Sequence, residues 1–148
     1  MREGVTLARK LGAEGIPVKL IVDAAACWFV SQVRLVLVGA DALSAQGLVN
    51  KTGTAVLALA AKNLGIDIYS LTSTAKLVPA GYQPPDQELR PPSEMLEEPP
   101  PNVTPVNYYF DLTPLEHLSG VVTEIGILPS EMLLRLLGTI RVHPALAV

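Results

Sequence analysis

Residues 37–54, LVGADALSAQGLVNKTGT, hold the side chains best suited to chemistry in this 148-residue chain. Asp41 directly follows an apolar run, where a carboxylate could accept a proton or hold a hydroxyl group. The same carboxylate could instead cap its own loop or the start of the next helix. Taken alone, Asp41 fits the chemical and the capping interpretation about equally well.

A second polar group lies further along the same stretch. The residues just before and at the start of a helix predicted over 53–64 are Asn50, Lys51, Thr52, Gly53 and Thr54. The first backbone N–H groups of a helix lack intrahelical partners and attract anions. Lys51 adds a full charge, and Gly53 permits a close backbone approach. The spacing predicts a phosphate or carboxylate site, although it lacks the P-loop pattern Gly-x-x-x-x-Gly-Lys-Ser/Thr.

Other reactive side chains fit structural roles better. Asp23 runs straight into three alanines, so we expect it to cap a helix. Cys27 lies in an apolar stretch and is expected to be an inert core thiol. His117 and His143 are far apart, with no acid or cysteine at ligand spacing. The sequence therefore predicts no metal site and no cofactor.

Alternating helices and strands must position these residues. The pattern predicts helices over 3–11, 24–31 and 53–64 and strands over 18–23, 34–40 and 67–72. Trp28 and Val30 are expected in the core. The first two of these strands are apolar runs without alternation, which is typical of parallel strands covered on both faces. We therefore expect an α/β fold with a parallel sheet.

Composition changes after residue 72. Ten of the thirteen prolines fall between Pro79 and Pro114, which predicts an extended surface loop over about 79–106. Order is expected to return with a strand end at 107–114. Two helices are then expected, over 114–126 and 129–138.

The composition predicts one globular domain over residues 1–148, with 49% apolar and 17% charged residues. A net charge of −3 offers no broad positive surface for nucleic acid or an anionic membrane. No apolar run reaches the roughly 18 residues of a membrane span. A single cysteine, and charged residues near the amino end in place of a signal peptide, favour a cytoplasmic protein. The high apolar share indicates that a partner covers some of the surface.

Three segments, in order along nearly the whole chain, resemble one family. REGVTLARKLGAEGIPVKLIVDAA is similar to the segment that follows the family's Arg-Pro motif. LVLVGADALSAQGLVNKTGTAVLALAAKNLGIDIY resembles its signature, and FDLTPLEHLSGVVTEIGILP resembles its Asp-x-Thr-Pro turn and closing helix. The chain thus resembles the translation initiation factor two-B alpha/beta/delta family, which includes methylthioribose-1-phosphate and ribose-1,5-bisphosphate isomerases.

The resemblance implies a Rossmann-like three-layer domain with a mainly parallel sheet, without the amino-terminal helical domain of longer relatives. Asp41 matches the acid that the isomerases pair with a cysteine from an upstream region, a place that Cys27 does not occupy. Asn50 and Lys51 match their substrate-binding pair. Glu3 stands where the isomerases carry a glutamine before a glycine.

The favoured function is a dimerising module that binds a sugar phosphate or nucleotide. Asp41 is its candidate catalytic residue, and the candidate binding residues are Asn50, Lys51, Thr52 and Gly53. The expected partners are a second copy or a related subunit. One alternative is an aldose–ketose isomerase of a sugar 1-phosphate, complete only with a missing half. Another is a regulatory subunit of translation initiation, which the glutamate at position 3 favours.

Overall fold

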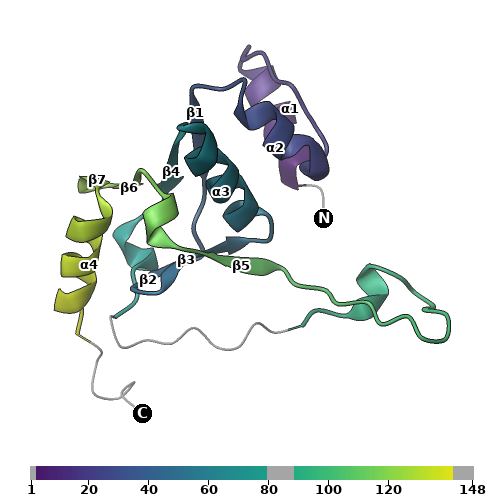
Figure 1. The fold of residues 1–148 in the computed structure, drawn as a ribbon. Helices are drawn as coiled ribbons and strands as arrows, with labels where there is room; N and C mark the ends of the chain where they lie inside the picture. The colour runs from purple at the N-terminus through teal and green to yellow at the C-terminus, as the bar shows by residue number, and fades with distance from the viewer. Residues whose placement is uncertain (1–2, 80–88, 142–148) are drawn as a thin grey trace.

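The computed structural model describes residues 3–79 and 89–141 (Figure 1). Its helices are α1 (Glu3–Ala13), α2 (Ala26–Val30), α3 (Thr54–Leu64) and α4 (Ser130–Thr139). Short 3-10 turns span Asp23–Ala25, Thr74–Lys76, Pro92–Glu94 and Leu115–His117. The helices predicted over 3–11, 53–64 and 129–138 are therefore confirmed.

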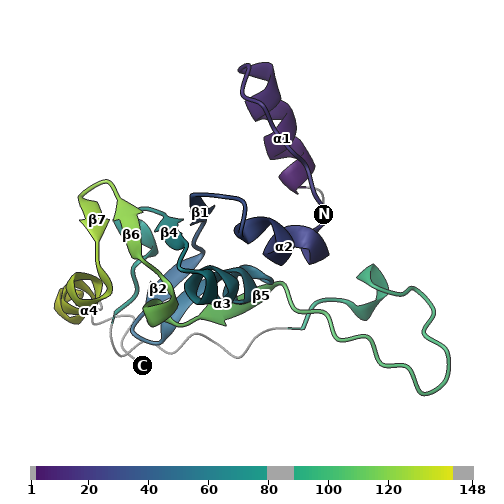
Figure 2. The ribbon, with the colours of Figure 1, turned by 45° about the horizontal axis from the view of Figure 1, so that its top comes forward.

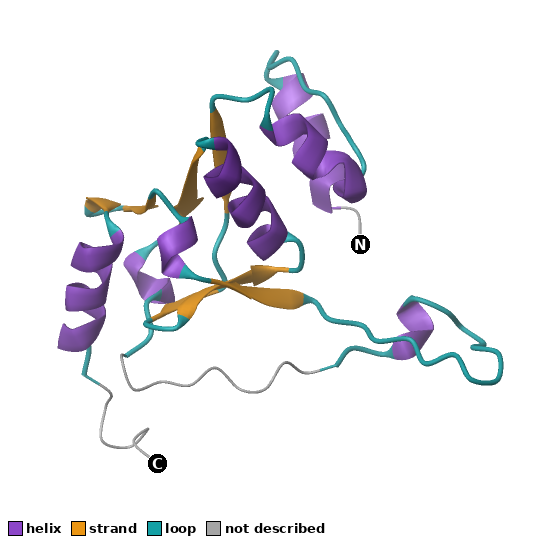
Figure 3. Cartoon of the chain, in the orientation of Figure 1, coloured by secondary structure: helices purple, strands orange, loops and turns teal. Residues whose placement is uncertain are grey.

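The larger sheet has the strand order β1-β4-β6-β7 (Figure 3). Its strands are β1 (Leu35–Val38), β4 (Asp67–Leu71), β6 (Gly120–Thr123) and β7 (Gly126–Leu128). β4 pairs in parallel with both β1 and β6, and β7 returns antiparallel to β6. The structure thus confirms an α/β fold with a mainly parallel sheet.

A second, antiparallel sheet was not predicted. It contains β2 (Ala42–Ser44), β3 (Gly47–Lys51) and β5 (Phe110–Thr113), in that order. Sequence analysis treated residues 41–52 as a loop, because two strands this short show little alternation. Gly47 fixes the packing: its φ is 151°, and a Cβ there would lie 2.5 Å from the Thr113 carbonyl oxygen. Only glycine allows β3 and β5 to approach this closely.

Helix α3 contacts both sheets, through β4 and through β5. It buries Thr54, Ala58 and Ala61, and small side chains of this kind allow close helix-to-sheet packing. Gly65, at φ 66°, ends the helix in the left-handed conformation that is typical of a glycine at this position. The start of α3 is thereby held beside the end of β3, where the candidate residues lie.

The amino-terminal region differs from expectation. Residues 16–22 form neither helix nor strand, so the strand predicted over 18–23 is wrong. No strand pairs with this segment, and its apolar side chains remain largely exposed. Figure 2 shows α1 standing away from the sheets, and α1 has no buried residue.

Helix α2 is shorter than the predicted helix 24–31 and packs against α3. Val30 is buried, as predicted. Cys27 is exposed and the Trp28 side chain is 76% exposed, so the prediction that both lie in the core is wrong.

The helix predicted over 114–126 is also wrong. A 3-10 turn at Leu115–His117 is followed by β6 and β7. Residues 121–123 are β-branched and favour a strand, and Gly126, at φ 121°, makes the turn into β7. The apolar spacing that predicted a helix comes instead from two short strands.

The proline-rich region forms an arm that extends away from the sheets (Figure 1). Its described part runs from residue 89 into β5, with one turn at Pro92–Glu94. Residues 80–88 of the predicted loop lie outside the described residues. Among residues 3–79 and 89–141, no helix is both long and apolar enough to cross a membrane.

Candidate functional site

The start of α3 is occupied by a carboxylate of the chain itself. Oδ2 of Asp111, on β5, accepts hydrogen bonds from the backbone N–H groups of Gly53 (2.7 Å) and Ala55 (3.1 Å). A carboxylate at a helix N-terminus is stabilised by these unpaired donors and by the helix dipole. The anion site that the sequence predicts at the amides after Gly53 is therefore filled by Asp111. The Asp-Leu-Thr-Pro sequence was the available signal, but Asp111 was assigned no role.

Two further candidate residues hold the β3–α3 turn in place. Asn50 Nδ2 donates to Thr54 Oγ1 (3.0 Å), and Thr54 Oγ1 donates to the Lys51 carbonyl oxygen (2.7 Å). Thr52 ties the same turn to the arm, since its Oγ1 donates to the Tyr108 carbonyl oxygen (2.8 Å). Gly53 adopts φ 107°, which a residue with a side chain rarely adopts. These contacts fix the position from which the Lys51 side chain projects.

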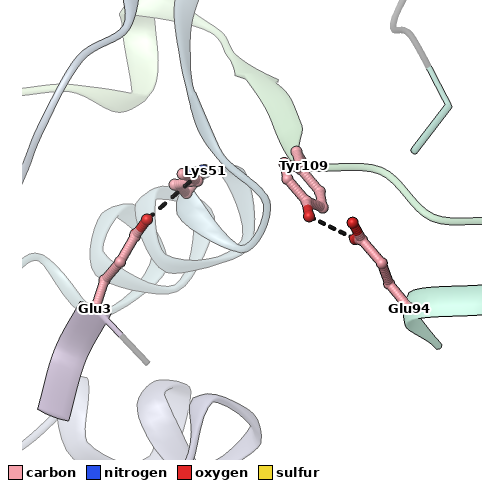
Figure 4. Close-up of polar contacts among 4 residues, drawn as sticks. All are labelled: Glu3, Lys51, Glu94 and Tyr109. Atoms are coloured by element: carbon pink, nitrogen blue, oxygen red, sulfur yellow. Dashed lines mark hydrogen bonds and ion pairs between the residues drawn. The ribbon is translucent and has the colours of Figure 1, made fainter. Parts of the chain in front are cut away.

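The Lys51 ammonium group is held mainly by aromatic rings. Its Nζ lies 5.0 Å from the centroid of Tyr109 and 4.9 Å from that of Phe110. Within the described residues its carboxylate partner is Glu3, at 3.9 Å (Figure 4). An aromatic face orients a cation without neutralising it, and an exposed pair at this distance is weak. The Lys51 charge thus stays available to an anionic group.

Lys51 opens onto a pocket of about 530 Å³. The pocket lies between the first turn of α1, residues 20–23, the β3–α3 turn and residues 107–109; its charged lining residues are Glu3, Asp23 and Lys51. The Asp23 carboxylate makes no hydrogen bond within the described residues, so the prediction that it caps a helix is wrong. Among the candidate residues, the structure brings Lys51 and Thr52 into this pocket.

Asp41 does not line the pocket. Its backbone N–H donates to the Val49 carbonyl oxygen (2.9 Å), which holds it beside the end of β3. Its side chain is exposed and caps neither its loop nor α3 in the described structure. Val49 directly precedes Asn50 on β3, so the Asp41 backbone lies near that candidate residue. Within the described residues the Asp41 carboxylate has no polar partner.

Sequence reasoning missed the contribution of the arm. The Tyr109 hydroxyl donates to Glu94 Oε2 (2.5 Å), and Asn107 Nδ2 donates to the same oxygen (3.0 Å; Figure 4 shows the first contact). The hydrogen bond from Tyr109 is the main cause that lowers the pKa of Glu94, and it also raises the pKa of Tyr109. The Arg90 guanidinium lies 5.0 Å from the Tyr109 ring centroid. The arm thus positions the ring that holds Lys51.

Metal ligation has no basis among the described residues. No group of three or more His, Cys, Asp or Glu side chains lies close enough together there to hold an ion. His117 is half-buried in the turn after β5, and His143 lies outside the described residues. Among the described residues, Lys51 is suited to binding an anion, and the nearby Asp23 carboxylate makes no hydrogen bond.

Comparison with known proteins identifies the relatives. The sequence profile of the Initiation factor 2 subunit family (IF-2B) matches residues 1–130. The ribose 1,5-bisphosphate isomerase of Pyrococcus furiosus is 36% identical over 135 residues, which cover 86% of this chain and 42% of that protein. The methylthioribose-1-phosphate isomerase of Oleidesulfovibrio alaskensis is 38% identical over 133 residues, covering 82% and 37%.

The structural comparison agrees. The crystal structure of the Pyrococcus horikoshii OT3 translation initiation factor eIF-2B matches with a TM-score of 0.73 at 35% identity, covering 86% of this chain and 45% of that one. The chain thus spans less than half the length of these relatives. With the profile matched over most of its length, this chain belongs to the Initiation factor 2 subunit family.

Proposed function

We propose that this chain works in the cytoplasm as a dimerising module that binds a sugar phosphate, with Lys51 as the contact for the phosphate group. The observation that carries the proposal is the Lys51 ammonium group, oriented by Tyr109 and Phe110 at the mouth of a pocket. The names of its relatives, which are isomerases of sugar phosphates, support this ligand class. The single cysteine fits a reducing compartment.

The pocket suits a small phosphorylated ligand in size and chemistry. Its volume of about 530 Å³ lies within the range of small-molecule sites, about 300–1,000 Å³. Hydrogen bonds from an ammonium to a phosphate are charge-assisted and are about twice as strong as neutral ones. Asp23 and Asn107 also line the pocket and can bind sugar hydroxyl groups. A nucleotide shares the phosphate and ribose, so the same contacts would serve it.

The test is a titration with ribose 5-phosphate, followed by NMR shifts of the Thr52 and Gly53 amides. Lys51→Met should weaken binding at least about tenfold, because it removes a charge-assisted hydrogen bond. Lys62→Met removes the same charge at the far end of α3 and should leave the affinity unchanged. Ribose without phosphate should bind far more weakly. Equal affinities for Lys51→Met and the wild type would refute the assignment, and competition by adenosine monophosphate would extend it to nucleotides.

We propose that the chain dimerises through β7, an edge strand of the larger sheet, and the helix α4. Apolar side chains of the β6–β7 turn, β7 and α4 are 44–61% exposed there: Ile125, Ile127, Met132 and Leu134. An exposed apolar group of this kind is typical of a protein interface. Light scattering at micromolar concentration should give twice the monomer mass, and Ile127→Lys should reduce it. A wild-type monomer would contradict this part of the proposal.

Isomerase activity is the second candidate, and the state of Asp41 favours it. The Asp41 side chain is exposed and has no hydrogen bond or ion pair within the described residues, so it is available to move a proton of a sugar that reaches it. Because the chain spans 42% of the Pyrococcus furiosus enzyme, the assay should combine it with the unmatched part of such a relative. Conversion of ribose 1,5-bisphosphate that is lost with Asp41→Asn would support catalysis. Conversion that survives this substitution would reject the role of Asp41.

A further inference from the structure

Glu3 and Lys51 meet at the mouth of the pocket, although they come from distant parts of the chain. Glu3 lies in the first turn of α1, and Lys51 is the last residue of β3. Glu3 Oε1 lies 3.9 Å from Lys51 Nζ, and both residues line the pocket (Figure 4). A carboxylate of the chain thus stands where an anionic ligand would approach the ammonium group.

We propose that Glu3 is a built-in competitor of the ligand: its carboxylate occupies Lys51 in the empty site and must leave when a phosphate binds. The inference rests on the proposed phosphate contact at Lys51 and adds its regulation. The charges of the described pocket lining favour this exchange. Its described lining contains two carboxylates, on Glu3 and Asp23, and one cation, so a phosphate that entered beside an unmoved Glu3 would face net repulsion.

The attachment of α1 makes the exchange easy. No residue of α1 is buried, and the Glu3 and Lys51 side chains are 68% and 42% exposed. Little packing is therefore lost when the first turn moves away from the pocket. The rings of Tyr109 and Phe110 hold Lys51 from another side, so its position does not depend on Glu3.

Binding and the position of α1 are then linked in both directions. If Glu3 lowers the affinity for phosphate by some factor, phosphate lowers the association of Glu3 with Lys51 by the same factor. A partner that pulls α1 away would strengthen ligand binding, and one that fixes α1 in place would weaken it. The amino-terminal helix thereby regulates the site.

The experiment uses the full chain and inorganic phosphate, at pH 7.5 and low salt, with the Thr52 and Gly53 amides as reporters. Glu3→Gln should bind phosphate about two- to fivefold more tightly than the wild type, the range expected for removal of an exposed ion pair. Glu14→Gln is the matched control, because it changes the net charge equally from just beyond the other end of α1. Its affinity should equal that of the wild type.

Any other result contradicts competition by Glu3. Some of these results also contradict the phosphate site itself. Equal affinities for Glu3→Gln and the wild type, or an equal gain in Glu14→Gln, would reject competition by Glu3 but leave the phosphate site standing. If neither the wild type nor Glu3→Gln binds phosphate at Thr52 and Gly53, the proposed function fails with it.

Discussion

The start of α3 and the Lys51 side chain are neighbours in sequence but are built in opposite ways. At the start of α3 the backbone donors are paired with Asp111, and the adjoining side chains of Asn50 and Thr54 are paired with each other. Lys51 instead rests on two aromatic rings and one distant, exposed carboxylate. The comparison separates the polar groups around Asp111, which stabilise the fold, from the Lys51 side chain, which has a charge available for a ligand.

Asp111→Ala should have the largest effect on stability. It removes two hydrogen bonds to the start of α3, one of them 2.7 Å long, and leaves their donors without a partner. We expect a loss of about 2 kcal/mol in the free energy of unfolding, at the upper end for an N-terminal cap. Denaturant unfolding measures it. Asp111→Asn keeps an acceptor and should lose less; no loss in either variant would contradict the structural role of this acid.

Thr54→Val should have a smaller effect. The side chain is 5% exposed, and its hydroxyl both accepts from Asn50 and donates to the Lys51 carbonyl oxygen. Valine keeps the volume but leaves these partners unpaired, at a cost of about 1–1.5 kcal/mol in unfolding free energy. Thr52→Val, at an exposed position with one such hydrogen bond, is the comparison and should cost less. An equal loss of unfolding free energy in the two variants would show that both threonines stabilise the fold.

Docking of the arm should depend on pH. The pKa of Glu94 is lowered from 4.5, so its contact stabilises the fold above that pH and is lost as the pH falls through the lowered value. The pKa of Tyr109 is raised from 10.0, so its protonated form stabilises the contact below that pH and is lost as the pH rises through the raised value. The side-chain amide signal of Asn107 should change at both limits. In Tyr109→Phe the alkaline change should disappear.

Lys51→Met should have the smallest effect on stability, even though it should abolish most of the binding. Its ammonium group is partly exposed, weakly paired with Glu3 and in contact with two aromatic rings, so the free energy of unfolding should change by less than about 1 kcal/mol. The same denaturant unfolding measures the change. A loss as large as that of Asp111→Ala would show that Lys51 serves the fold, and the contrast between the two regions would no longer hold.

Much of the α/β core could be predicted from the sequence because its signals are local. The apolar run of β1, the short strand β4 and the helix that ends at Gly65 are indicated by residues close together in the sequence. The sheet of β2, β3 and β5 was missed for two reasons: β2 and β3 are too short to show alternation, and β5, which pairs with β3, lies beyond the arm. Lys51 was found from its place before α3, whereas its contact with Tyr109 and the capping role of Asp111 depend on residues beyond the arm, and the Tyr109–Glu94 contact lies within the arm.

The hydrogen bond from Gly53 to Asp111 joins residues that are 58 positions apart, and this separation bears on the order of folding. A loop of this length must close before these contacts can form, and the loss of conformational entropy on closure slows their formation. The β1–α3–β4 unit can assemble without the arm, but Lys51 meets Tyr109 only after residues 107–113 have returned to β3. We therefore expect the pocket to be completed late in folding, and cleavage within the arm would separate β5 and β6 from β3 and β4, the strands that they pair with.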